Sequence, residues 1–137
     1  MAALRAGVQI APNEPSLLNF LGYSLLERRQ KIDEAKAFIA RAAALQPDNN
    51  AITDSLGWAH FLSGDYERAV EILEKAALDE PTEPTINEHL GDAYWRAGRR
   101  IEARYAWRAA ALTASEAAQA RLTEKTDLGL TDATVAK

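Results

Sequence analysis

The sequence predicts an all-α protein built as an α-solenoid, in which antiparallel helix pairs stack one after another. A Leu-Gly dipeptide occurs three times, and an alanine follows it each time at a fixed distance, at Ala35, Ala69 and Ala103, so that both intervals are 34 residues long. Three prolines recur at intervals of 35 and 34 residues. A repeat of this length that fills most of a chain is typical of helical solenoids.

Each repeat unit contains two segments of helical length. In the first unit, residues 13–48, apolar or small residues recur at i, i+3, i+4 and i+7, which places them on one face of a helix. They are Leu18, Leu21, Gly22 and Leu25 in the first segment and Ala35, Ile39 and Ala42 in the second. The same pattern occurs in units 49–82 and 83–114, so we expect three helix pairs.

The two ends of the chain depart from the complete unit. Within residues 1–12, the segment Leu4–Pro12 has the pattern of the second helix of a preceding unit, so we expect a partial repeat and a longer array upstream. Residues 115–128 are expected to form one extra helix that caps the last unit. Residues 129–137 show no hydrophobic periodicity. We expect them to form a flexible tail, because chain ends without anchoring contacts are usually mobile.

The repeated positions resemble those of the tetratricopeptide repeat, whose pattern combines a bulky residue, Leu-Gly, a Tyr-like position, Ala, a Phe-like position, Ala and Pro. The resemblance covers about residues 15–125 and departs from the pattern at Thr53, Asn87 and Ser115. Residues 54–58 and 89–96 resemble the last repeats of long bacterial adaptor or scaffold proteins of this family. The resemblance implies the bacterial cell envelope or periplasm as location, with the cytoplasm as the alternative.

The same resemblance implies a concave groove, lined by the first helix of each pair, that binds peptide or helical segments. The residues facing away from the Leu-Gly contacts form its candidate lining: Asn19, Tyr23, Asp54, Trp58, Phe61, Glu88, His89, Asp92 and Trp95. Exposed aromatic rings beside carboxylates favour a partner with apolar and basic residues. The alternative is that Trp58, Phe61 and Trp95 only pack between neighbouring helices.

A second candidate surface is basic. Arg100, Arg104 and Arg108 follow one another at four-residue intervals, which places them on one side of a helix. This patch could bind an acidic partner. We favour the alternative that it pairs with the acidic residues of the preceding unit's second helix, among them Glu71, because charged runs commonly form solvated pairs.

Composition and charge exclude several kinds of function. Residues 48–83 carry nine acidic and two basic side chains, an imbalance that disfavours binding to nucleic acid. The absence of cysteine excludes disulfides and thiolate metal sites. No stretch approaches the roughly 18 apolar residues of a membrane-spanning helix, so no membrane insertion is expected.

No catalytic motif is present, so we expect that the protein is not an enzyme and needs no cofactor or metal. His60 and His89 are 29 residues apart and lack a third ligand in register. The sequence therefore predicts a protein-interaction module whose groove binds a segment with apolar and basic residues. The alternative is a structural segment that forms homo-oligomers through its uncovered half-repeat at Leu4–Ile10.

Overall fold

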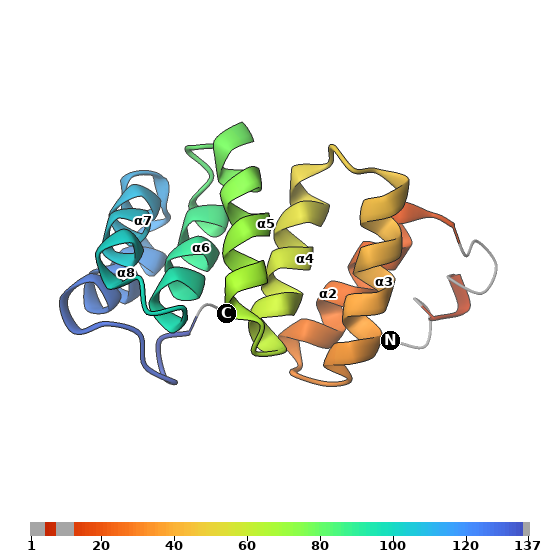
Figure 1. Ribbon diagram of the computed structural model, residues 1–137, viewed down its shortest axis with the longest axis horizontal. Helices are drawn as coiled ribbons and strands as arrows, with labels where there is room; N and C mark the ends of the chain where they lie inside the picture. Colours follow the sequence, from red (N-terminus) through yellow and green to blue (C-terminus); the bar gives the residue numbers. More distant parts are fainter. Residues whose placement is uncertain (1–4, 8–12, 136–137) are drawn as a thin grey trace.

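The computed structural model describes residues 5–7 and 13–135 of the 137 residues. Across this range the structure is helical and contains no β-strand (Figure 1). Its helices are α2 Pro15–Glu27, α3 Ile32–Leu45, α4 Asn50–Leu62, α5 Tyr66–Asp79, α6 Pro84–Arg96, α7 Arg100–Thr113 and α8 Glu116–Leu128. The predicted all-α solenoid is confirmed.

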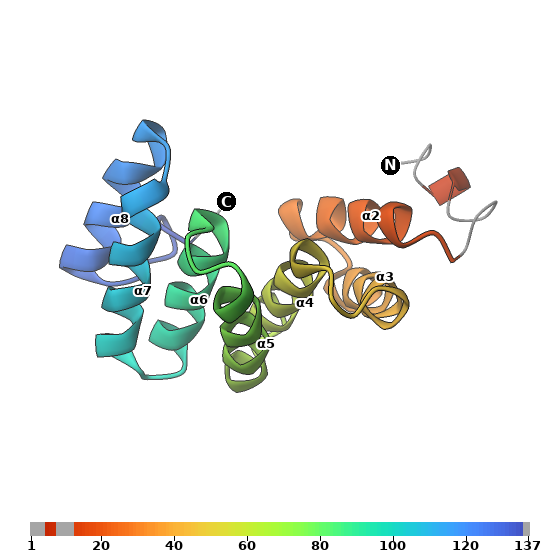
Figure 2. The same ribbon diagram turned by 90° about the horizontal axis from the view of Figure 1, so that it is seen from above.

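The helices form a curved stack in which each helix contacts the next one along the chain. Figure 2 shows α2, α4 and α6 on the concave side and α3, α5 and α7 on the convex side. Helix α8 packs on α7 and also reaches α6, because its Lys125 bonds to Glu88 of that helix. It therefore continues the row of concave-side helices beyond α6.

The Leu-Gly pairs mark the points where the two helices of a unit cross most closely. A Cβ atom added to any of the three glycines would come within 2.5 Å of the side chain opposite it. The contacts are Gly22 with Ile39, Gly57 with Leu73, and Gly91 with Trp107. The repeated glycine thus lets the second helix insert a large side chain against the backbone of the first.

The described residues at the two ends of the chain lie outside the three helix pairs. Residues 5–7 are helical, whereas the rest of Leu4–Pro12, including most of the expected oligomer surface, lies outside the described residues. At the other end, Leu130 and Thr134 are buried and Val135 packs against the core. The expectation of a tail without anchoring contacts is therefore corrected for residues 129–135, while residues 136–137 lie outside the described part.

Candidate functional site

The concave side contains a cavity of about 320 Å³ bounded by α2, α4 and the connection from α5 into α6. Asn19 and Tyr23 of α2 and Asp54 of α4 line it, so three of the expected groove residues meet in one place. Phe20 also lines the cavity, and 63% of its surface is exposed. A large aromatic side chain left open to solvent beside a cavity is a good contact for an apolar ligand group.

The charged side chains of this cavity are all acidic. Glu80 and Glu83 join Asp54 in its lining, and no Lys or Arg side chain does. The side-chain oxygen Oδ1 of Asn19 is buried and has no hydrogen-bond partner. Burial, followed by the negative charges of Asp54 and Glu27, raises the pKa of Tyr23. The cavity therefore combines apolar surface with negative charge.

Trp58 does not present its face to solvent as expected. It is only 2% exposed and its ring stacks on Phe61 of its own helix, with 4.5 Å between the ring centroids. On its other side it stacks on His89 of α6, at a centroid distance of 4.1 Å. Trp58 and Phe61 therefore pack between neighbouring helices, which was the alternative interpretation of these aromatic residues.

His89 connects α4 to α6 through a polar contact as well. Its Nδ1 atom lies 2.8 Å from Oδ1 of Asp54, and both side chains are buried. Burial by itself lowers the pKa of His89, but the carboxylates of Asp54, Asp92 and Glu88 outweigh it, so the pKa is raised. The expected groove residue His89 thus stabilises the contact between two units.

The raised pKa of His89 predicts a dependence of stability on pH. Protonated His89 stabilises the fold fully below its unfolded-state pKa of about 6.5, and this contribution is lost as the pH rises through the higher folded-state pKa. The free energy of unfolding should therefore fall from neutral to mildly alkaline pH. His89→Gln should flatten this slope in urea titrations, and an unchanged slope in this variant would show that His89 does not titrate in this range.

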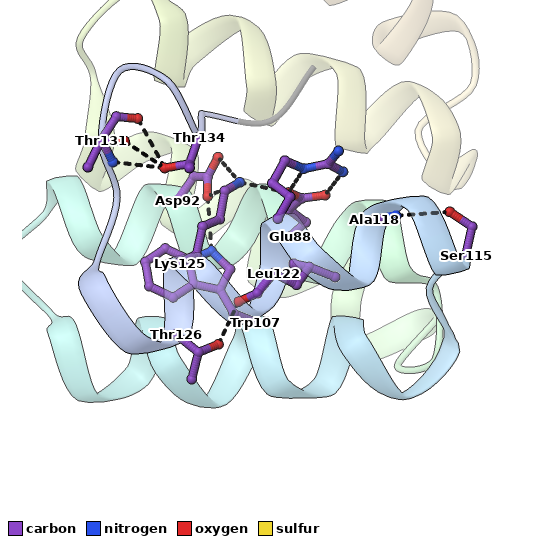
Figure 3. A network of polar contacts seen from close by, with 11 residues as sticks. Glu88, Asp92, Trp107, Ser115, Ala118, Leu122, Lys125, Thr126, Thr131 and Thr134 are labelled. Carbon is purple, nitrogen blue, oxygen red and sulfur yellow. Dashed lines mark hydrogen bonds and ion pairs between the residues drawn. The ribbon is translucent and has the colours of Figure 1, made fainter.

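Glu88 and Asp92, which were expected to face a ligand, are instead paired with α8 (Figure 3). Nζ of Lys125 lies 2.7 Å from Oε2 of Glu88 and 3.0 Å from Oδ1 of Asp92, and the Lys125 side chain is completely buried. Arg121 adds a two-pronged contact to Glu88 at 2.7 and 2.8 Å. Burial alone raises the pKa of Glu88, but Arg121 and Lys125 outweigh it and lower the pKa.

Trp107 completes this network. Its Nε1 donates a hydrogen bond to Oδ1 of Asp92 at 2.9 Å, so one carboxylate receives bonds from both α7 and α8. The cation that the sequence led us to expect from a partner is supplied by the protein itself. Arg121 and Lys125 lie 33 residues after Glu88 and Asp92, which is close to one repeat length and is the sequence signal for this pairing.

The expected basic patch is divided between two aromatic contacts. Arg100 and Arg104 lie over the ring of Trp95, at 4.5 and 5.2 Å from its centroid, and Arg108 lies over Tyr105. Trp95 is partly buried and packs against Trp107. These arginines thus serve a packing role that the sequence did not indicate.

The contact of Glu74 on α5 with the third unit also differs from the expected pairing of second helices. It uses Arg99, whose Nη2 lies 3.9 Å from Oε2 of Glu74, and Tyr94, whose hydroxyl donates to Oε2 of Glu74.

Residues 5–7 and 13–135 contain no group of three His, Asp or Glu side chains placed to hold a metal ion. In the same part of the chain, no helix has the length and apolar character needed to cross a membrane.

Residues 55–78, which include the second Leu-Gly contact and most of α5, match the family model of the tetratricopeptide repeat. The chain carries tetratricopeptide repeats. The TPR repeat-containing protein PA4667 of Pseudomonas aeruginosa is 36% identical over 89 residues, which are 65% of this chain. The match covers 15% of the length of PA4667, so this tetratricopeptide chain spans only a small part of that relative.

Solved structures share the fold of this tetratricopeptide chain at lower sequence identity. The type III secretion translocator chaperone SycD of Yersinia enterocolitica has a TM-score of 0.73 and 17% identity, over 82% of this chain and 89% of SycD. PilF of Pseudomonas aeruginosa has a TM-score of 0.72 and 19% identity, over 90% and 56%. PcrH, solved with the chaperone binding region of PopB, has a TM-score of 0.69 and 21% identity, over 85% and 94%.

Proposed function

We propose that this tetratricopeptide chain is a protein-interaction module that binds a peptide or helical segment on its concave side, with the cavity between α2, α4 and α6 as the principal contact. The single observation that carries the proposal is the composition of that cavity. It offers the exposed ring of Phe20 together with the carboxylates of Glu80 and Glu83. A segment with apolar and basic residues complements both features.

The unpaired acceptor of Asn19 supports a polar contact with the same ligand. A buried oxygen without a hydrogen bond costs free energy, which a donor on the ligand would recover. Such a donor is available from a backbone N–H group or from a lysine or arginine side chain.

Similarity of fold provides further support. The structure of PcrH contains a binding region of another protein, PopB, so a chain of similar fold binds a segment of a protein partner. The acidic lining of the cavity disfavours a polyanionic ligand such as nucleic acid.

Fluorescence polarisation with a matched pair of labelled peptides tests the proposal. The probe is an amphipathic peptide of leucine and lysine, and its control carries glutamate in place of lysine. We expect the lysine peptide to bind more tightly, and Phe20→Ala and Glu80→Lys each to weaken its binding about tenfold, which corresponds to about 1.4 kcal/mol.

The matched control variant is Glu67→Lys, which makes the same charge change at an exposed position of α5 outside the cavity lining. Equal affinity for the two peptides, or an equal loss of affinity in Glu67→Lys and Glu80→Lys, would contradict a binding site in this cavity.

A further inference from the structure

The segment after α8 turns back over the concave side of the stack. Gly129 has a φ of 85°, and a Cβ atom there would lie 2.3 Å from the ring of Trp95, so this close approach requires glycine. Asp132 and Val135 of this segment line one cavity together with Phe61 of α4 and Arg96 of α6, so the segment lies against both of these helices. The segment 129–135 thus lies where a groove ligand would be expected.

The contacts of this segment are apolar and local. Leu130 is 9% and Thr134 is 4% exposed. Thr131 and Thr134 bond to each other through their backbone and hydroxyl groups, which closes a short turn visible in Figure 3. The ion pair to the stack joins Asp132 to Arg96 at 3.5 Å, and the Asp132 side chain is fully exposed. Exposed pairs of this kind add little stability.

The segment also contributes to the lining of a second cavity. Asp132 lines a second cavity of about 380 Å³ together with Tyr23, Glu27, Arg29 and Trp58. Tyr23 also lines the cavity assigned to the ligand, so the two spaces adjoin at this residue. A ligand that extends from the first cavity along the groove therefore meets the segment 129–135.

The segment brings a negative charge to the concave groove. Residues 129–135 contain Asp132 and no basic side chain. Asp132 lines the second cavity together with Glu27 and Arg29, so a cationic ligand group bound there would be attracted to the two carboxylates and would compete with Arg29 for them. A basic ligand should therefore compete effectively against this occupant.

We propose that the segment 129–135 is an autoinhibitory cover of the concave groove, which a ligand with apolar and basic residues must displace. The ligand part of this inference rests on the proposed function, whereas recognition of the segment by the groove does not. When the segment covers the groove in most molecules, the apparent affinity for a ligand equals the intrinsic affinity multiplied by the fraction of molecules in which the groove is open.

A crosslink and a deletion test the cover from opposite directions. The chain contains no cysteine, so Arg29→Cys with Asp132→Cys introduces the only two thiols, at positions that line the same cavity. Joining them with a short bismaleimide should weaken binding of the leucine–lysine probe at least tenfold relative to the same variant without the crosslinker. Deleting residues 129–137 should strengthen probe binding several-fold. Unchanged affinity in both forms would overturn the proposal.

A second measurement keeps the cover testable without a groove ligand. A synthetic peptide of residues 129–137, added to the deleted chain at millimolar concentration, should shift the indole N–H signals of Trp58 and Trp95 in NMR spectra. The signal of Trp107, which is bonded to Asp92, serves as the internal reference. If these signals do not move, the cover is disproved; if they move while no form binds the leucine–lysine probe, only the proposed ligand chemistry is disproved.

Discussion

Replacing Lys125 by methionine is expected to lower the free energy of unfolding by about 3–5 kcal/mol, the range typical for removing one partner of a buried ion pair. Methionine preserves the length of the side chain but removes the ammonium group, which is completely buried and contacts both Glu88 and Asp92. Two buried carboxylates would then lie close together without that cation. Arg121 would still pair with Glu88, and Trp107 would still donate its hydrogen bond to Asp92.

Guanidinium titration followed by circular dichroism measures this loss. Lys75→Met is the matched control, because Lys75 is exposed on α5 and its replacement should change stability by less than about 0.5 kcal/mol. Adding Asp92→Asn to Lys125→Met should recover part of the loss, since it removes one of the uncompensated charges. A loss below about 1 kcal/mol in Lys125→Met would show that α8 is not fixed by this ion pair.

Replacing Trp58 by alanine is expected to cost about 3–5 kcal/mol of stability, as is usual for truncating a buried aromatic residue. The ring lies between Phe61 and His89, so its loss opens a cavity at the contact between the second and third units. Loss of ligand binding in this variant would therefore report damage to the stack before it reported a lost groove contact.

Phe20→Ala is the control for the Trp58 replacement. It also truncates an aromatic residue of a concave-side helix, but one that is 63% exposed, so its stability should change by less than about 0.5 kcal/mol. The two variants should thus separate stability from binding. Trp58→Ala should lose stability, whereas Phe20→Ala should lose binding of the probe. Trp58→Ala with full stability and lost probe binding would mean that Trp58 faces the ligand after all.

The helical stack could be predicted from the sequence because its cause is local and repeated. Each small residue of the Leu-Gly and alanine positions marks a close helix crossing, and Gly22, Gly57 and Gly91 indeed lie against large side chains of the second helices. Asn19, Tyr23 and Asp54 could also be placed on the concave side from the helical register, and they line one cavity.

The burial of Trp58, Glu88, His89 and Asp92 could not be predicted in the same way. Register within one helix says which residues share a face, but it does not say how much of that face the next helix covers. Each of these residues contacts a helix of a neighbouring unit or the cap. The polar contacts join residues 33 to 37 positions apart, so a search for opposite charges one repeat length away would have found several of them.

The position of residues 129–135 could not be predicted, because their sequence has no hydrophobic periodicity. Their packing depends on one glycine turn and on the shape of the surface around Trp95, neither of which a pattern of apolar residues reveals. Sequence analysis also did not identify Phe20, Glu80 and Glu83 as residues that line the first cavity. The two glutamates lie at the connection between α5 and α6, outside the helix faces that the repeat defines.

The most direct test of the proposed binding site is an NMR titration of the isotope-labelled chain with the leucine–lysine peptide. The proposed site predicts that the largest chemical shift changes map to Phe20, Tyr23, Asp54 and Glu80 on the concave side. Changes confined to the convex helices α3, α5 and α7, or an equal response to the leucine–glutamate peptide, would contradict it.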